Sequence, residues 1–199
     1  MRALAALVAA YLIGAVPVGF LVARAFGVGD IRQHGSGNIG MTNVLRTAGR
    51  LPGLLTLVGD VAKGYLAVVA GAALGATPLL AALAAVAAVV GNCWSIFLRF
   101  RGGKGVATGL GAFLNLVPWA VLPAAVVWLV VTISFRYVSL GSIMAAVCVP
   151  LGALLLGYPL ASAGACAGAA VIVIVRHHEN LTRLVAGSER QLGQRPAAH

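Results

Sequence analysis

The sequence predicts an all-α integral membrane protein with seven transmembrane helices, because of its composition and its long apolar runs. Of the 199 residues, 61% are hydrophobic and 9% are charged, whereas a soluble domain carries about 25% charged residues. A spanning helix needs about 20 apolar residues. Runs of this length or longer are Ala3 to Ala23, Leu51 to Ala76, Pro78 to Leu98, Val106 to Phe135 and Val138 to Val175. Lipid is therefore the expected solvent.

The first run is interpreted as a retained span rather than a cleavable signal peptide. Arg2 and the small residues of Ala23-Arg24-Ala25 resemble the two ends of a signal peptide. The apolar core of such a peptide has only about 7 to 15 residues, however. This run is longer, so we expect it to cross the membrane.

The second and third runs give one span each, and the last two runs give two each. As a single helix, Val106 to Phe135 would be about 45 Å long, against a hydrocarbon core of about 30 Å. Pro118 supplies a break, which leaves a short first helix and a second helix from Trp119 to Phe135. The last run divides in the same way near Gly157-Tyr158-Pro159.

Basic residues test this count, because they gather in the cytoplasmic loops of membrane proteins. They occur in alternate loops here, and the second, fourth and sixth loops contain no Lys or Arg. The basic residues are Arg24, Arg32, Arg46 and Arg50 in the first loop, Arg99, Arg101 and Lys104 in the third, Arg136 in the fifth, and Arg176, Arg183, Arg190 and Arg195 in the tail. Seven spans therefore place the N-terminus outside and the C-terminus in the cytoplasm, and six would place the arginine-rich tail outside.

We expect residues 1–199 to form a single transmembrane domain, since all helices must pack around one interior. The 26 glycines allow the close backbone approach that is typical of membrane bundles. Cys93, Cys148 and Cys166 lie far apart in apolar segments and are interpreted as packing residues. The net charge of +10 is interpreted as membrane topology rather than nucleic-acid binding, because no basic helix of a soluble domain is present.

The first polar segment, Gly35 to Gly49, lies between the first two spans. Its glycines allow backbone N–H groups to converge on an anion, and Arg46 offers a bidentate fork for phosphate or carboxylate. Neutral hydrogen bonds would come from Ser36, Asn38, Thr42 and Asn43. The alternative is an ordinary polar turn with an arginine topology signal.

The second polar segment, Arg101 to Thr108, places Gly102-Gly103-Lys104-Gly105 directly before a helix. Unpaired N–H groups and the positive end of the helix dipole suit a phosphate, with Lys104 as its counter-charge. It is not a Walker A loop, because the glycine spacing differs and no strand precedes it. The alternative is a cytoplasmic cap that fixes orientation.

The third polar segment, Arg176 to Glu189, follows the last span. If the helix continues, His177, Asn180 and Arg183 share one face and converge on one ligand. A solvated amphipathic tail explains the charges equally well. Adjacent histidines are not by themselves a metal site.

Two charges lie within the second span, and hydroxyls lie in the fifth loop. Asp60 and Lys63 are spaced i, i+3, and charges at such depth are paired or functional. We interpret them as a structural ion pair near the cytoplasmic end of the span, where it braces the site. Ser139 and Ser142, close to Arg136, can contribute hydroxyls.

Together these segments resemble the bacterial acyl-phosphate:glycerol-3-phosphate acyltransferase family. Ser36 to Arg46 fits the family pattern Ser-Gly-Asn-x-Gly-Ala-Thr-Asn-x-x-Arg, Gly102 to Thr108 fits Gly-Gly-Lys-Gly-Val-Ala-Thr, and Arg176 to Glu189 fits Arg-His-x-x-Asn-Ile-x-Arg-Leu-x-x-Gly-x-Glu. The second motif of the family begins with Gly-His-x-x-Pro-x-Phe, which corresponds here to Gly91 to Phe97. The departures from the patterns are Met41 for Ala, Leu181 for Ile, Asn92 for His and Ser95 for Pro.

The resemblance implies transfer of a fatty acyl group from acyl phosphate to the 1-hydroxyl of sn-glycerol 3-phosphate, giving lysophosphatidic acid and phosphate in phospholipid synthesis. It implies a bacterial plasma membrane protein with its active site on the cytoplasmic side and without a cofactor or metal. Its partners would be the two substrates and membrane lipid, with no nucleic acid.

By the same resemblance, the acyl-phosphate phosphate would be bound by Ser36, Gly102, Gly103 and Gly105, and glycerol 3-phosphate by Arg46, Lys104, Ser142, His177 and Asn180. Asn38, Thr42, Asn43 and Arg183 complete the expected substrate-binding set. Catalysis would rest on proximity and electrostatic stabilisation, with His177, Lys104 and Arg46 as the catalytic residues. The base is either His177 or a phosphate oxygen of a substrate.

Two other functions remain open from the sequence. A transporter of phosphorylated solutes also uses helix N-termini and basic residues to bind anions. A catalytically silent relative that binds lipid precursors is the second, for which Asn92 and Ser95 are the only signs.

Overall fold

The computed structural model describes residues 1–75 and 77–194. Ala76, the last residue of the second apolar run, and Arg195, in the basic tail, therefore lie outside the described residues. Within these residues the chain is entirely helical, as predicted. The helices are α1 (Arg2–Ala15), α2 (Val18–Ala25), α3 (Met41–Ala48), α4 (Arg50–Leu74), α5 (Pro78–Cys93), α6 (Val106–Leu116), α7 (Pro118–Phe135), α8 (Val138–Leu155), α9 (Leu160–Arg176) and α10 (His178–Val185), with short 3-10 turns η1 (Ile31–Gln33) and η2 (Ile96–Leu98).

Five helical segments are long and apolar enough to cross a membrane: α1 with α2, α4, α5 with η2, α7, and α8. Helices α9 and α10, which meet at an angle of 58°, are long and apolar enough only as a pair, so there are six such segments if this bent pair is counted as one. The predicted breaks are confirmed, since α6 ends at Leu116 before Pro118 and α9 begins at Leu160 after Pro159. The short helix α6 has 11 residues, and about 16 Å of helix covers only half of the hydrocarbon core.

The packing places small residues inside and large apolar residues outside. Leu155 is 87% exposed and Leu160 is 80% exposed, whereas alanines make up most of the buried apolar residues. Helices α1 and α5 approach closely through glycines, because a side chain at Gly14 would meet the backbone of Ala88 and one at Gly91 would meet the backbone of Tyr11. Small residues at helix contacts are typical of bundles whose solvent is lipid.

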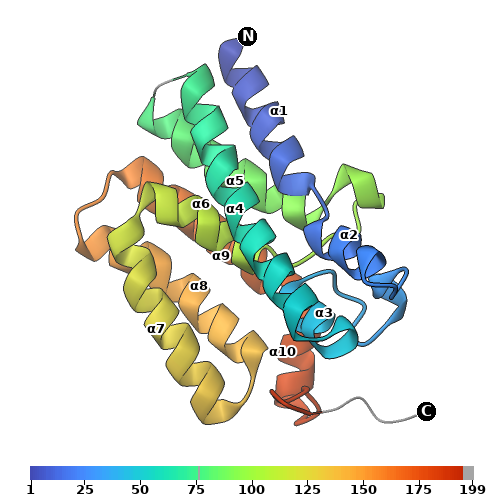
Figure 1. The fold of residues 1–199 in the computed structure, drawn as a ribbon. Helices are drawn as coiled ribbons and strands as arrows, with labels where there is room; N and C mark the ends of the chain where they lie inside the picture. The colour runs from blue at the N-terminus through green and yellow to red at the C-terminus, as the bar shows by residue number, and fades with distance from the viewer. Residues whose placement is uncertain (76, 195–199) are drawn as a thin grey trace.

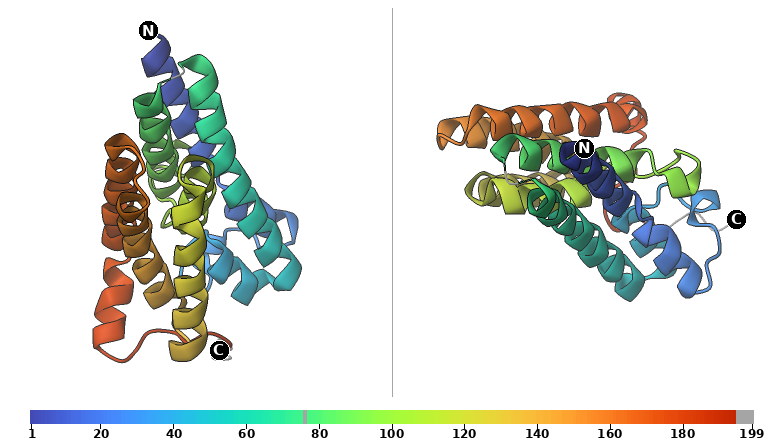
Figure 2. Two further views of the ribbon diagram at one scale, coloured as in Figure 1. Left: turned by 90° about the vertical axis from the view of Figure 1, so that its left-hand side faces the viewer. Right: turned by 90° about the horizontal axis from the view of Figure 1, so that it is seen from above.

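The three polar segments gather at one end of the bundle. Figure 1 shows α2, α3 and α10 at the end opposite the N-terminus, and the turned view in Figure 2 shows the same arrangement. Helices α1, α4 and α5 pack together on one side, and α7 and α8 form a hairpin on the other. Residues of the second segment, including Lys104, line the same cavity as residues of the first and third segments.

Candidate active site

A cavity of about 540 Å³ opens at this end and continues between the helices. Every residue that the sequence assigns to the site lines it except Gly102. The lining residues of this set are Ser36, Asn38, Thr42, Asn43, Arg46, Gly103, Lys104, Gly105, Ser142, His177, Asn180 and Arg183. Residues that are up to 147 positions apart in the chain (183 − 36) thus face one space.

Asn43, at the start of α3, holds the first segment in shape. Its side-chain oxygen accepts a hydrogen bond from the Ser36 N–H at 2.9 Å, and its amide donates to the carbonyls of His34 (3.0 Å) and Asn38 (2.8 Å). Gly35 has a φ of +60°, and a side chain there would collide with Asn43. Because its side chain is bonded within the loop, Asn43 acts in the structure as the scaffold that presents Ser36 and Asn38.

Arg46 reaches from α3 toward the C-terminal tail. Its guanidinium donates long hydrogen bonds to the carbonyls of Arg190 (3.5 Å) and Gln191 (3.4 Å). Burial lowers the pKa of Arg46, and the nearby Arg190 lowers it further, but an arginine stays charged in proteins. Carbonyls at these distances are weak partners, so this cation is available to a stronger one.

The glycine loop before α6 is fixed from both sides. The N–H of Gly102 donates to the Cys93 carbonyl at 3.2 Å, and the N–H of Gly103 donates to the Asn92 carbonyl at 2.9 Å. The carbonyls of both glycines accept from Arg176, at 3.3 and 3.2 Å. These two N–H groups are therefore already bonded, and the N–H groups without helical partners at the start of α6 are those of Gly105, Val106, Ala107 and Thr108.

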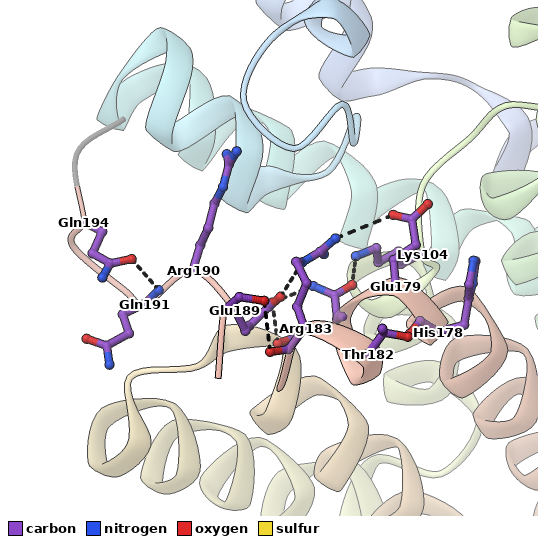
Figure 3. Close-up of polar contacts among 12 residues, drawn as sticks. Lys104, His178, Glu179, Thr182, Arg183, Glu189, Arg190, Gln191 and Gln194 are labelled. Atoms are coloured by element: carbon purple, nitrogen blue, oxygen red, sulfur yellow. Dashed lines mark hydrogen bonds and ion pairs between the residues drawn. The ribbon is translucent and has the colours of Figure 1, made fainter. Parts of the chain in front are cut away.

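Lys104 is linked to the third segment through a network that ends at Glu189 (Figure 3). Its ammonium donates to the Asn180 side-chain oxygen. The Asn180 amide donates in turn to Glu189 at 2.5 Å, and Ser139 (2.7 Å) and Arg183 (2.8 Å) donate to the same carboxylate. Glu189 thus joins α8, α10 and the tail, a role that the sequence interpretation missed although this residue ends the third motif.

The electrostatics of this network favour binding of an anion. Burial alone would raise the pKa of Glu189, but the hydrogen bonds from Arg183, Ser139 and Asn180 lower it below its ordinary value. Burial lowers the pKa of Lys104 to about 8, while Glu189 partly opposes this shift. At the rim of the cavity, Arg46, Lys104 and Arg183 face the single carboxylate of Glu189, so positive charge is in excess there.

His177 lies just beyond α9, at the bend before α10, and it is 3% exposed. Its Nδ1 lies 2.7 Å from the Val173 carbonyl, which assigns the proton of the neutral ring to Nδ1 and leaves Nε2 as an acceptor. Burial lowers the pKa of His177 to about 4. The ring is therefore neutral at physiological pH and a weak proton acceptor.

Away from the charged rim the cavity becomes apolar. Alanines of three helices line it, including Ala124 of α7, Ala145 of α8 and Ala169 of α9, and it extends to Val149 and Cys166. Along α8 the lining runs from Val138 to Val149, about 16 Å at 1.5 Å per residue.

Ser142 stands where the rim meets this apolar part. Its hydroxyl donates to the Val138 carbonyl at 2.8 Å and accepts from the Trp128 indole at 3.2 Å. Trp128 also lines the cavity. The space therefore suits a ligand with an anionic head and an apolar tail.

The intramembrane ion pair is present as predicted, and it lies beside this cavity. Asp60 and Lys63 are 2.7 Å apart and both are buried. Asp60 and Asn92 line the cavity, although the sequence interpretation did not include them in the site. The sequence signal for Asp60 was the cost of burying a charge within a span.

Comparison with known proteins gives one consistent result. A family model described as glycerol-3-phosphate acyltransferase matches residues 4–187. The chain is 47% identical over 194 residues to a glycerol-3-phosphate acyltransferase of Aromatoleum aromaticum, covering 97% of this chain and 98% of the relative. It is 50% identical over 192 residues to glycerol-3-phosphate acyltransferase 2 of Moorella thermoacetica, covering 96% and 98%.

Two solved structures have the same fold. Both are of PlsY, an integral membrane glycerol 3-phosphate acyltransferase. Its glycerol 3-phosphate form matches with a TM-score of 0.91 and 35% identity, covering 97% of this chain and 96% of the other. Its lysophosphatidic acid form matches with a TM-score of 0.90 and 34% identity, over the same shares of the two chains.

Proposed function

This chain belongs to the glycerol-3-phosphate acyltransferase family, and we propose that it transfers a fatty acyl group from acyl phosphate to the 1-hydroxyl of sn-glycerol 3-phosphate. The products are lysophosphatidic acid and inorganic phosphate. One observation carries the proposal: a single cavity joins a cationic rim to an apolar space between helices. Both proposed substrates carry phosphate, and one carries a fatty tail.

The cationic rim suits the two phosphates. Arg46, Lys104 and Arg183 supply charge to the phosphate of glycerol 3-phosphate. Asn180 has one amide N–H left to donate, and His177 Nε2 and the Ser142 oxygen can accept hydrogen bonds from the hydroxyls of glycerol 3-phosphate. Thr42 and Asn38 line the same rim. For the phosphate of acyl phosphate, Ser36 and the backbone N–H groups at the start of α6, next to Gly105, provide hydrogen-bond donors. Gly102 and Gly103 contribute by shaping the loop, since their N–H groups are bonded within the protein, and Asn43 contributes as a scaffold.

Catalysis then rests on proximity and electrostatics. The mixed anhydride is already activated, so the glycerol hydroxyl attacks the acyl carbon directly while the C–O bond to phosphate breaks, and phosphate leaves with the bonding electrons. Lys104 and Arg46 hold the phosphate of glycerol 3-phosphate so that its hydroxyl lies against the acyl carbon, and the N–H groups at the start of α6 stabilise the charge on the leaving phosphate. A base with a pKa far below the working pH is a poor proton acceptor, which favours a substrate phosphate oxygen over His177. His177 Nε2 then orients the hydroxyl.

We further propose that residues 1–199 form one domain of seven membrane segments, with α6 as a short segment, in the bacterial plasma membrane. The arginine distribution supports an outside N-terminus and a cytoplasmic site. A reporter that is active only in the cytoplasm, fused after residue 199, is expected to be active. Activity of a periplasmic reporter there would contradict this orientation.

The function is tested by supplying the purified protein in phospholipid vesicles with acyl phosphate and labelled glycerol 3-phosphate. We expect labelled lysophosphatidic acid, and none with Lys104→Ala. Arg101, which is exposed and does not line the cavity, offers a matched control: Arg101→Ala should keep activity. Absence of product from the unaltered protein with dispersed donor would refute the proposal.

A further inference from the structure

Three buried polar side chains form a cluster beside the glycine loop, apart from the network around Glu189. Asp60 and Lys63 belong to α4, and Asn92 belongs to α5; they are 5%, 6% and 6% exposed. Asp60 and Asn92 line the cavity, whereas Lys63 lies behind them. We refer to Asp60, Lys63 and Asn92 as the inner cluster.

Lys63 holds the other two members of the inner cluster side by side. Its ammonium donates to the Val16 carbonyl at 2.7 Å and to the Asn92 side-chain oxygen at 2.9 Å, and it lies 2.7 Å from Asp60 Oδ1. Two hydrogen bonds and one ion-pair contact thus surround the ammonium. Lys63 is therefore committed within the protein, and its task is to fix Asp60 and Asn92.

Hydrogen-bonding capacity is left over on the cavity side. Asp60 Oδ1 is shielded and in ion-pair contact with Lys63, whereas the other carboxylate oxygen, Oδ2, is not shielded in this way and accepts no hydrogen bond from the residues that the structure describes. Within the same residues, the Asn92 amide nitrogen donates to no acceptor, while its oxygen is taken by Lys63. Buried polar groups without partners are costly, so an acceptor and a donor await a ligand at the same point of the wall.

The inner cluster lies next to the phosphate-binding rim. The Asn92 carbonyl accepts from the N–H of Gly103 at 2.9 Å, and Gly103 precedes Lys104 in the chain. A small phosphorylated alcohol whose phosphate contacts Lys104 thus has its carbon chain close to Asp60 and Asn92. A hydroxyl is the group that donates one hydrogen bond and accepts another, which is what this pair offers.

We propose that Asp60 and Asn92 bind the hydroxyl of glycerol 3-phosphate that is not acylated. This hydroxyl donates to the Asp60 carboxylate and accepts from the Asn92 amide. It keeps its proton throughout the reaction, whereas the acylated hydroxyl loses its proton and would leave the buried carboxylate facing an ester oxygen. The inference rests on the proposed function and adds a reason for selecting a diol phosphate over a simple hydroxyalkyl phosphate.

The test compares glycerol 3-phosphate with 3-hydroxypropyl phosphate, which keeps the phosphate and the primary hydroxyl but lacks the secondary one. Purified protein in phospholipid vesicles with acyl phosphate is expected to prefer glycerol 3-phosphate in kcat/KM by on the order of 100-fold or more, because sites built to bind a hydroxyl reject analogues without it. This measurement needs no substitution, so it does not depend on the folding of a variant.

Substitutions at position 92 assign the preference to the inner cluster. Asn92→Leu removes the amide and should lower kcat/KM for glycerol 3-phosphate by roughly 10-fold to 100-fold, with little change for 3-hydroxypropyl phosphate. Asn92→His offers one ring nitrogen to Lys63 and an N–H to the cavity, so it should retain the preference. Ser95→Ala is the matched control, because Ser95 is buried and bonded to the Ala15 carbonyl but does not line the cavity.

Equal kcat/KM values for the two acceptors with the unaltered protein would overturn the inference, since the pair would then bind only water. An equal loss on both acceptors in Asn92→Leu would also overturn it, because that result indicates a structural or proton-transfer role. In both cases acylation of glycerol 3-phosphate itself still supports the proposed function. Acylation of neither acceptor by the unaltered protein would refute the proposed function and the inference together.

Discussion

The cavity has two polar regions that differ in charge. At the rim, Arg46, Lys104 and Arg183 outnumber the single carboxylate of Glu189, and the tail that carries Glu189 is open to solvent. Deeper in the bundle, Asp60 and Lys63 cancel each other within 2.7 Å, and Asn92 is neutral. From this difference we infer two binding roles. The positively charged rim binds phosphate near water, and the neutral inner cluster binds uncharged groups at a depth where a net charge would be costly.

The largest expected effect follows from removing rim charge. Lys104→Ala and Arg46→Ala should each lower kcat/KM for glycerol 3-phosphate by on the order of 10³-fold, because each removes a charge that holds the phosphate of glycerol 3-phosphate in place for the reaction. Steady-state kinetics on purified protein measures this, with helical content from circular dichroism as the folding control. Near-normal rates in both folded variants would contradict the role of the rim.

A smaller effect is expected when the rim keeps its positive charges but loses the carboxylate of Glu189, which holds its side chains together. Glu189→Gln removes the negative charge and replaces one of the two oxygens that accept from Arg183, Ser139 and Asn180 by an amide donor, and we expect a loss of about 2 kcal/mol of stability. The readout is the melting temperature in detergent. Asp60→Asn provides the comparison in the inner cluster, since it leaves the buried Lys63 unpaired and should destabilise the protein at least as much. An unchanged melting temperature in Glu189→Gln would show that the network is not structural.

The pH dependence of kcat/KM should reveal the contribution of the rim, because Lys104 loses its charge gradually as the pH rises. The pKa of Lys104 is about 8, so its charged form is complete well below that pH and is lost as pH rises through it. We expect kcat/KM for glycerol 3-phosphate to fall about tenfold per pH unit above that point. Lys104→Arg should remove this fall, because arginine stays charged. A profile that is flat to pH 10 in the unaltered protein would contradict the assignment.

Much of this arrangement follows from local sequence signals. Pro118 fixes the break between α6 and α7 because a proline disfavours helix at the preceding residue, and the i, i+3 spacing of Asp60 and Lys63 on one helix puts them within ion-pair reach. The three motifs converge because alternate loops of a bundle emerge at the same end. These features depend on short spacing or on topology, and both can be derived from the sequence.

Other features depend on partners that spacing does not reveal. The N–H groups of Gly102 and Gly103 turn back to the carbonyls of Cys93 and Asn92, although the glycines before a helix suggested phosphate binding. Asn43 holds the loop from Ser36 instead of facing substrate alone. A loop's hydrogen-bond acceptors can lie anywhere in the fold, so only the three-dimensional arrangement identifies them.

The most direct test of the account follows both products of one turnover. Purified protein in vesicles receives acyl phosphate labelled in its phosphate group together with labelled glycerol 3-phosphate, and released phosphate and lysophosphatidic acid are counted. The account predicts equal amounts of the two products, with both dependent on the acceptor and on Lys104. Release of phosphate without lysophosphatidic acid would contradict it. Formation of lysophosphatidic acid in a parallel reaction with an acyl thioester, but not with acyl phosphate, would also contradict it.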